Sequence, residues 1–310
     1  MIKNFFYNNI IFFSIIIIIF YIGILIFSDV DEIFNHIFQI DIFYIPIIFS
    51  LVVLHLIILG IKYHRILQKL KISIPLKESI KIFLSGISLI ATPGGAGTAI
   101  KSQILKKKYD VPISKSLPII LIERLTELIA NIIILLVFFY WANLFESTYA
   151  IVIGTFFVFI MYLLISKNKI FHSLKIFLKK IKKVKNFSDS IDSSKESFQI
   201  LTKNSVLLEM TGWSLIAKFF QLIAVYFIFI SLNIDLGIIL SGQIYFTSLI
   251  LGSLSFLPSG IIVTESTMIA ILNNNGITIS MATILVIFVR LATTWFATIL
   301  GIITLKITYK

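Results

Sequence analysis

The chain alternates between long apolar runs and short polar connectors, a pattern typical of a protein that crosses a membrane several times. Six of the runs are continuous and close to the length of about 20 residues that spans a bilayer. They cover residues 10–27, 43–61, 116–139, 148–165, 206–231 and 280–305. The pattern predicts a transmembrane helix in each of these six segments.

Two further apolar stretches, residues 79–105 and 237–272, are interrupted in the middle by proline and glycine. The first contains TPGGAG at residues 92–97, and the second contains LPSG at residues 257–260. Proline lacks an amide proton and clashes with the preceding turn, and glycine favours open backbone, so a straight helix is not expected there. Both stretches are predicted to be broken, re-entrant hairpins that enter and leave the membrane on one side.

Composition supports a polytopic membrane protein. Of the 310 residues, 58% are hydrophobic, only 14% are charged and none is cysteine. A soluble domain has about 25% charged residues, so these values exclude a soluble globular protein, a disordered chain and a disulfide scaffold. The net charge is +12, but the basic residues lie between the apolar spans, so no nucleic-acid partner is expected.

The distribution of charge predicts the orientation. Basic residues crowd the connectors 62–81, 101–115 and 166–205, whereas connector 28–42 is acidic. If both termini are cytoplasmic, all 27 basic residues lie inside except the three within apolar segments, which leaves 24 inside and none outside. Positive-inside asymmetry of this kind predicts a multi-pass cell-membrane protein with both termini in the cytoplasm. The first hairpin would open to the cytoplasm and the second to the exterior.

The sequence also repeats itself. Residues 89–124 and 254–290 share, in order, Pro-x-Gly, Ile-Leu, a triplet of Lys or Asn, Ile-Ser and an apolar run that reaches Arg. Inverted repeats with interrupted helices are typical of transporters with a site near the midplane. The expected fold is therefore an all-α polytopic membrane protein, with about six transmembrane helices plus two re-entrant broken hairpins in an inverted repeat.

A single membrane domain, residues 1–310, is expected. Its predicted parts are an anchor helix and outer loop (1–42), repeat 1 (43–139), a connecting helix with a basic cytoplasmic loop (140–205) and repeat 2 (206–310).

Three charged residues, Glu123, Arg124 and Glu127, interrupt one apolar run. A charge in hydrocarbon costs at least about 2.5–3.5 kcal/mol, so such residues face the protein interior and pair. Their spacing allows all three to share one helix face. Two hypotheses remain open: Arg124 is neutralised by its own helix neighbours and locks packing, or it contacts an anionic head group.

The second repeat carries its own polar residues. Arg290 has no acid within its own helix, so Glu265 in the second hairpin is the expected partner. Lys218 and Gln221 are one helical turn apart and are expected to line one cavity; alternatively, Lys218 extends its stem toward the membrane interface. His55 is expected to be a hydrogen-bonded structural residue.

The glycine-rich tip is a candidate anion site. Gly94, Gly95 and Gly97 precede a helix predicted to restart near Thr98, whose free amides and positive dipole end suit a phosphate. The alternative is an ordinary tight turn, and the Gly-Lys-Ser/Thr step of a phosphate loop is missing. The basic segment 175–187 either lies on anionic lipid or is an ordinary cytoplasmic loop.

No nucleophile–base pair and no metal-ligand spacing is recognisable in the sequence. We therefore expect neither an enzyme nor a catalytic residue, and neither a metal nor a cofactor.

Three places in the chain resemble the lysylphosphatidylglycerol synthase transmembrane family of flippase-like membrane proteins. They are residues 92–97 with Lys101, then Glu123-Arg124 with Glu127, and residues 257–260 with Glu265, Arg290 and Trp295. The resemblance covers residues 43–303 and implies a membrane protein that translocates, or helps to modify, charged or glycosylated lipids. In this chain Thr98, Lys101, Glu127 and Ser259 replace the Glu, Arg, Asp and Gly usual in that family.

These observations favour a translocase for an anionic or glycosylated lipid head group. Its expected substrate-binding residues are Arg124, Arg290, Lys218, Gly94, Gly95, Gly97, Thr98, Lys101 and Gln221, with Glu123, Glu127 and Glu265 as charge-pairing residues. The expected partners are anionic lipids and, in one alternative, a separate transferase. That alternative is an accessory subunit or enzyme of lipid modification or glycosylation; another is a secondary transporter of a small anionic solute.

Overall fold

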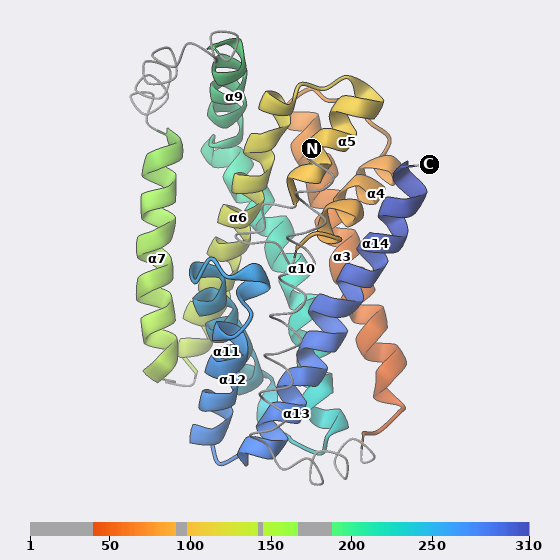
Figure 1. Cartoon of the computed structure of the whole chain (residues 1–310). Helices are drawn as coiled ribbons and strands as arrows, with labels where there is room; N and C mark the ends of the chain where they lie inside the picture. The colour runs from red at the N-terminus through yellow and green to blue at the C-terminus, as the bar shows by residue number, and fades with distance from the viewer. Residues whose placement is uncertain (1–39, 91–97, 142–144, 167–187, 310) are drawn as a thin grey trace.

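Helices make up all the regular structure of the described residues, so the predicted all-α fold is confirmed. The computed structural model describes residues 40–90, 98–141, 145–166 and 188–309 (Figure 1). Its helices are α3 (Tyr44–Lys69), α4 (Leu76–Ile87), α5 (Ile100–Tyr109), α6 (Ile113–Phe139), α7 (Phe145–Ser166), α9 (Ser188–Leu201), α10 (Asn204–Ser231), α11 (Gly237–Leu254), η3 (Pro258–Gly260), α12 (Val263–Asn274), α13 (Ile279–Arg290), η4 (Leu291–Trp295) and α14 (Phe296–Tyr309).

Five of these helical segments are long and apolar enough to cross a membrane. They are Tyr44–Lys69, Phe145–Leu163, Asn204–Ser231, Gly237–Leu254 and Ile279–Thr308. The first, second, third and fifth agree with predicted spans. The predicted anchor at residues 10–27 and the basic segment 175–187 lie outside the described residues.

Two helices differ from the predicted scheme of spans. α6, predicted as a span over residues 116–139, is one helix of 27 residues. It is not among the five helices apolar enough to cross a membrane, because it contains the charged residues Glu123, Arg124 and Glu127. α11 was expected to be one arm of a broken hairpin. It is an unbroken helix of 18 residues with the length and apolarity of a span, and the interruption comes only after it.

The chain breaks between α11 and α12, as proline and glycine in the sequence predict. Pro258 begins a single 3₁₀ turn, and Phe256, Ser259 and Ile262 have φ angles of 56°, 52° and 77°. L-residues rarely adopt positive φ, so the surrounding packing must hold this backbone in place. In the first predicted hairpin α4 ends at Ile87, and residues 91–97 lie outside the described part.

The two halves of the chain have matching contacts. α3 packs on α4, α4 on α5 and α5 on α6, just as α10 packs on α11, α11 on α12 and α12 on α13. α3 and α10 pack against each other, α4 packs on α14, and α11 packs on α6. α4 and α11 therefore each lie against a helix of the other half. In Figure 1 the α4–α5 pair lies in the upper half and the α11–α12 pair in the lower half.

Charge is divided between the two ends of the helix bundle. α5, α9 and the C-terminal end of α14 lie at the upper end in Figure 1, and the α12–α13 turn lies at the lower end. The upper segments carry lysines such as Lys106 and Lys306. At the lower end the described connectors carry Asp41 and Asp235 and no basic residue, and Glu146 lies in the first turn of α7. The folded chain thus has one basic and one acidic end.

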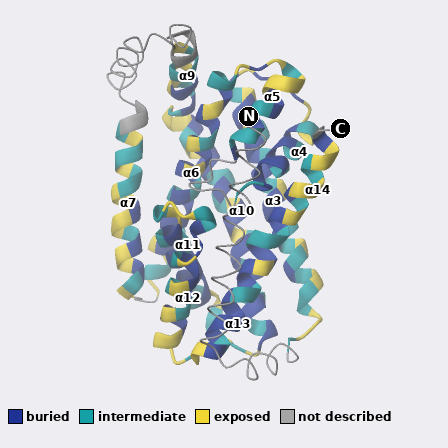
Figure 2. Ribbon diagram, viewed as in Figure 1, coloured by how far each residue is buried: buried dark blue, intermediate teal, exposed yellow. Residues whose placement is uncertain are grey.

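α7 presents an apolar face to its surroundings. Figure 2 shows it mostly in the colours of exposed and intermediate residues, whereas α10 is rich in buried ones. Tyr149, Val152, Phe156 and Phe159 are all more than half exposed. Because water would not favour such a surface and lipid would, this side of the bundle suits contact with acyl chains.

Candidate functional site

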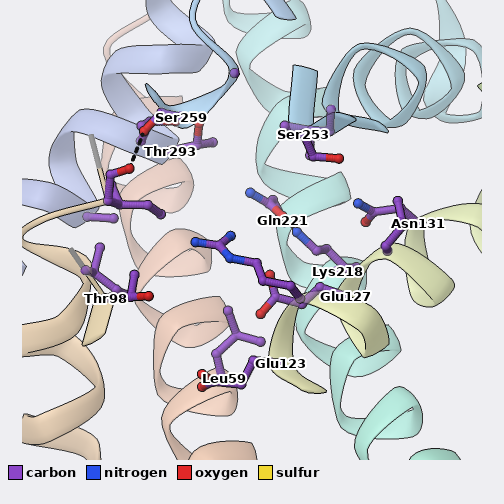
Figure 3. Close-up of a pocket in the computed structure, with 18 of the residues that line it drawn as sticks. Leu59, Thr98, Glu123, Glu127, Asn131, Lys218, Gln221, Ser253, Ser259 and Thr293 are labelled. Atoms are coloured by element: carbon purple, nitrogen blue, oxygen red, sulfur yellow. Dashed lines mark hydrogen bonds between the residues drawn. The ribbon is translucent and has the colours of Figure 1, made fainter. Parts of the chain in front are cut away.

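A cavity of about 360 Å³ lies within the bundle, and its lining includes Ile90, Thr98 and the turn at residues 257–260 (Figure 3). α3, α6 and α10 form its walls, and the turn after α11 and the helix after Arg290 close other sides. Its titratable lining residues are His55, Lys101, Glu123, Arg124, Glu127, Lys218, Tyr245 and Arg290. Buried polar groups at this depth are tolerated where they face the protein interior or a wet cavity.

Most of the predicted site residues meet in this cavity. Thr98, Lys101, Glu123, Arg124, Glu127, Lys218, Gln221 and Arg290 all line it. Glu265 lies beside it, next to the lining residue Thr264. Gly94, Gly95 and Gly97 lie outside the described residues.

The first carboxylate of α6 is paired with a lysine of α5. Lys101 Nζ lies 2.5 Å from Glu123 Oε2, and both side chains are buried. Gly86 leaves room for this lysine, since a Cβ there would lie 2.5 Å from Lys101 Cγ. The Lys101 ammonium also lies 5.0 Å from the centre of the Tyr63 ring, within the range of a cation–π contact.

The second carboxylate of α6 is paired with Lys62, which the sequence analysis placed in a cytoplasmic connector. That placement is wrong: α3 continues to Lys69, and the side chain of Lys62 is 1% exposed. Its ammonium lies 3.7 Å from Glu127 Oε1 and donates to Ser214 Oγ at 2.8 Å. The local sequence could not identify this residue, because a lysine at the end of an apolar run normally reaches the interface. The one signal in the sequence was the presence of two carboxylates on α6, which required cationic partners from elsewhere in the chain.

Arg290 pairs with Glu265, as predicted. Its Nε lies 2.8 Å from Glu265 Oε1, and the two side chains are 3% and 0% exposed. The same guanidinium donates to the Ser259 carbonyl oxygen at 2.9 Å, and the Ser259 hydroxyl donates to the Ile90 carbonyl oxygen at 3.3 Å. The pair therefore ties the break in the second half to the end of the first hairpin arm. A π-helical turn follows Arg290 directly, a feature frequent at functional sites.

Lys218 lies inside the cavity wall and has no carboxylate partner. It is 6% exposed, so the alternative of a side chain that extends to the interface is wrong. Its ammonium donates to Gln221 Oε1 at 2.8 Å, and Gln221 Nε2 donates to the Tyr245 hydroxyl at 2.6 Å. Within the described residues no Asp or Glu oxygen is within 4.0 Å of the Lys218 ammonium. His55, one helix away, is hydrogen-bonded to the Ala217 carbonyl oxygen at 2.8 Å, as its expected structural role requires.

Arg124 is exposed and faces the cavity. Glu123 and Glu127 form ion pairs with lysines of other helices, and neither is an ion-pair partner of Arg124. Within the described residues, Arg124 therefore forms no ion pair within 4.0 Å with the carboxylates of its own helix. No described residue forms a hydrogen bond or an ion pair with its guanidinium, which leaves it available to a ligand.

The cavity has an excess of positive charge. Lys62, Lys101 and Arg290 each pair with one carboxylate, whereas Arg124 and Lys218 have none. Two net positive charges in a region of low dielectric attract an anion strongly. Among the described residues no group of three or more His, Cys, Asp and Glu could hold a metal ion. The arrangement is chemically suited to anion binding.

Sequence reasoning missed some lining residues. Asn131, Tyr245, Ser253 and Thr293 contribute polar atoms to the cavity wall. In the sequence each is a single polar residue within an apolar helix, where an outward-facing serine or threonine is equally common. Asn131 alone gave a signal, because it follows Arg124 and Glu127 at helical spacing.

Comparisons with known proteins identify related chains. The profile of the family described as lysylphosphatidylglycerol synthase TM region matches residues 11–301. The UPF0104 membrane protein MJ1078 of Methanocaldococcus jannaschii is 31% identical over 206 residues, which cover 64% of this chain and 84% of that protein. No solved structure matches the chain.

Proposed function

We propose that this chain, which belongs to the lysylphosphatidylglycerol synthase TM region family, translocates anionic lipids across the cell membrane. The observation that carries the proposal is the pair of cations without carboxylate partners, Arg124 and Lys218, at a cavity of about 360 Å³ in an otherwise apolar bundle. A phosphodiester is a monoanion that accepts several hydrogen bonds, so it matches both the charge and the donors of this site.

The paired residues serve a different purpose from the two unpaired cations. Through buried ion pairs, Lys62 and Lys101 connect α3 and α5 to α6, and Arg290 connects α13 to α12. Arg124 and Lys218 are the groups that meet the head group. The acyl chains stay in the surrounding lipid, since a cavity of this size accommodates a head group and not two acyl chains.

The proposed path depends on the architecture. We propose that the α4–α5 and α11–α12 pairs are re-entrant hairpins of an inverted repeat and open toward opposite sides of the membrane. Their matching contacts and their positions in opposite halves of the bundle support this arrangement. The hydrogen bond from Ser259 to Ile90 places the turn of one hairpin beside the arm of the other. Alternating movement of the two hairpins would expose the cavity to each side in turn.

The proposal is tested by lipid movement in proteoliposomes. Purified protein is reconstituted with phosphatidylglycerol that carries a fluorophore on one acyl chain, and the labelled lipid reaching the other leaflet is measured by quenching. We expect Arg124→Gln and Lys218→Met each to slow this movement about tenfold or more, because each removes a charge-assisted hydrogen bond of about 1.5–3 kcal/mol.

Arg65→Gln is the matched control. Arg65 is a half-exposed cation that pairs with Glu209 at 3.0 Å, outside the cavity. Arg65→Gln removes one positive charge, as each cavity variant does, and should leave the rate of lipid movement unchanged. Equal rates for wild type, both cavity variants and protein-free vesicles would overturn the proposal. Uptake of a soluble anion without lipid movement would assign the cavity to a solute transporter instead.

A further inference from the structure

Asn131 is a polar side chain of the cavity wall that the proposed phosphate contacts of Arg124 and Lys218 do not use. Asn131 is 7% exposed, and its side-chain oxygen is buried without a hydrogen-bond partner in the described part of the chain. A buried amide left unsatisfied costs about 1–3 kcal/mol, so such groups in native proteins usually have a partner. Asn131 lines the cavity, and the missing partner is therefore expected to come from a ligand.

We propose that Asn131 forms a second subsite that binds the hydroxyl groups of a polyol or sugar carried on the lipid phosphate. This inference rests on the proposed function and names the class of head group that the cavity takes. An asparagine amide offers one acceptor and two donors, and a hydroxyl is both donor and acceptor, so the two groups satisfy each other.

The position of Asn131 on α6 fits a head group with two parts. Arg124, Glu127 and Asn131 are spaced by three and four residues, so they lie on one face of the helix. Asn131 is seven residues beyond Arg124, about 10.5 Å along the helix axis. A phosphate alone is too small to contact both Arg124 and Asn131, the two ends of this helix face. A phosphate at Arg124 and Lys218 with a ring or chain of hydroxyls beyond it covers the distance.

The surroundings of Asn131 favour hydroxyls over an ammonium group. Figure 3 shows Asn131, Lys218, Gln221 and Ser253 facing the same cavity. Lys218 places a positive charge beside the subsite, which repels ethanolamine, choline or lysyl amines. Gln221 and Tyr245 hold Lys218 through hydrogen bonds of 2.8 and 2.6 Å. Glu127, the lining carboxylate one helical turn before Asn131, is already ion-paired with Lys62 at 3.7 Å.

The test measures binding, so its result does not depend on whether the protein moves lipid. Detergent-purified full-length protein is titrated with short-chain phosphatidylinositol and with phosphatidylmethanol, which has the same charge but no free hydroxyl. We expect wild type to bind phosphatidylinositol roughly three- to tenfold more tightly, the value of one or two net hydrogen bonds. Asn131→Leu, similar in size, should remove this preference and leave phosphatidylmethanol binding unchanged.

Thr126→Val is the matched control. Thr126 lies on the same helix, fully buried and outside the cavity lining, and its hydroxyl donates to the Ile122 carbonyl oxygen at 2.8 Å. This variant should keep the preference. Glycerophosphoinositol, the same head group without acyl chains, should bind more weakly than the lipid; equal binding would make the ligand a soluble polyol phosphate and overturn the lipid assignment.

Three outcomes separate this inference from the proposed function. Equal affinity of wild type for both lipids, or a preference that survives Asn131→Leu, overturns the hydroxyl subsite. Tighter binding of phosphatidylethanolamine than of phosphatidylinositol overturns it as well. Selective binding with no movement in proteoliposomes supports the subsite and contradicts translocation.

Discussion

Buried ion pairs decide which cations of the cavity can meet a ligand. Arg290 is the clearest case, since its guanidinium contacts both a buried carboxylate and the backbone of the hairpin turn. A cation held this way is neutralised and structurally required. Arg124, three helical turns into α6, has the same side chain and no such partner. The same residue type thus has two roles, and its partner determines which.

Removing one member of the Arg290–Glu265 pair should destabilise the protein. Arg290→Met takes away the guanidinium that lies 2.8 Å from a fully buried carboxylate, so we expect a loss of about 3–5 kcal/mol. The double variant Arg290→Met/Glu265→Leu should recover much of this loss, because no buried charge remains. The measurement is the thermal unfolding midpoint of detergent-purified protein. A double variant no more stable than the single one would contradict the explanation.

At the residue scale, an ion-pair partner could be predicted where a charged residue has no opposite charge in its own apolar helix. Arg290 has no acid in its own helix, and Glu265 was the acid of the same repeat, so the pair could be predicted. Lys62 could not be recognised, because its partner Glu127 is 65 residues away on another helix. Such pairs depend on which helices become neighbours.

Close backbone contacts set the positions of the hairpin arms. α14 packs on α4, and Gly301 lies where a Cβ would be 2.6 Å from the Ser88 amide nitrogen and 2.8 Å from the Leu84 carbonyl oxygen. Gly252 has the same function between α11 and α12, where a Cβ would collide with Thr264. Both of these helix contacts therefore depend on a glycine.

Gly301→Ala should separate α14 from α4. Backbone atoms cannot rotate away as a side chain can, so we expect overpacking to cost about 1–3 kcal/mol. Gly212→Ala is the matched control, because nothing lies within 4 Å of its Cβ position in α10; that variant should gain about 0.5–1 kcal/mol. Both are measured by thermal unfolding in detergent. A Gly301→Ala protein as stable as Gly212→Ala would contradict this account of the contact.

At the scale of the whole molecule, the basic and acidic ends of the bundle predict its orientation. Lysines of α5 and α14 lie at one end, and Asp41, Glu146 and Asp235 lie at the other. Under the positive-inside rule we expect the basic end to face the cytoplasm. Both termini are proposed to be cytoplasmic.

The absence of cysteine makes this orientation directly testable. Asn274→Cys places a thiol in the exposed turn after α12, and Lys108→Cys places one near the end of α5 at the other end of the bundle. We expect a membrane-impermeant maleimide to label the first in intact cells and the second only after lysis. The opposite pattern would reverse the orientation, and external labelling of both would contradict the proposed hairpin topology.

Some features of this protein follow from its sequence alone. Apolar runs of spanning length determine a helical membrane protein, because only hydrogen-bonded helices can carry such a backbone through lipid. The break at Pro258 follows from the missing amide of proline. The excess of lysine at one end follows from the connectors. All three are local properties of the chain, so local reasoning was sufficient.

Only the tertiary structure decided how the charges are partitioned. Five cations and three carboxylates from six helices lie in or beside the cavity. Packing alone determines that Lys62, Lys101 and Arg290 are paired with carboxylates while Arg124 and Lys218 are not. The sequence contains the number of charges but not the distances between them. Because ion-pair energy in a low dielectric depends steeply on those distances, the character of the site was determined only when the helices came together.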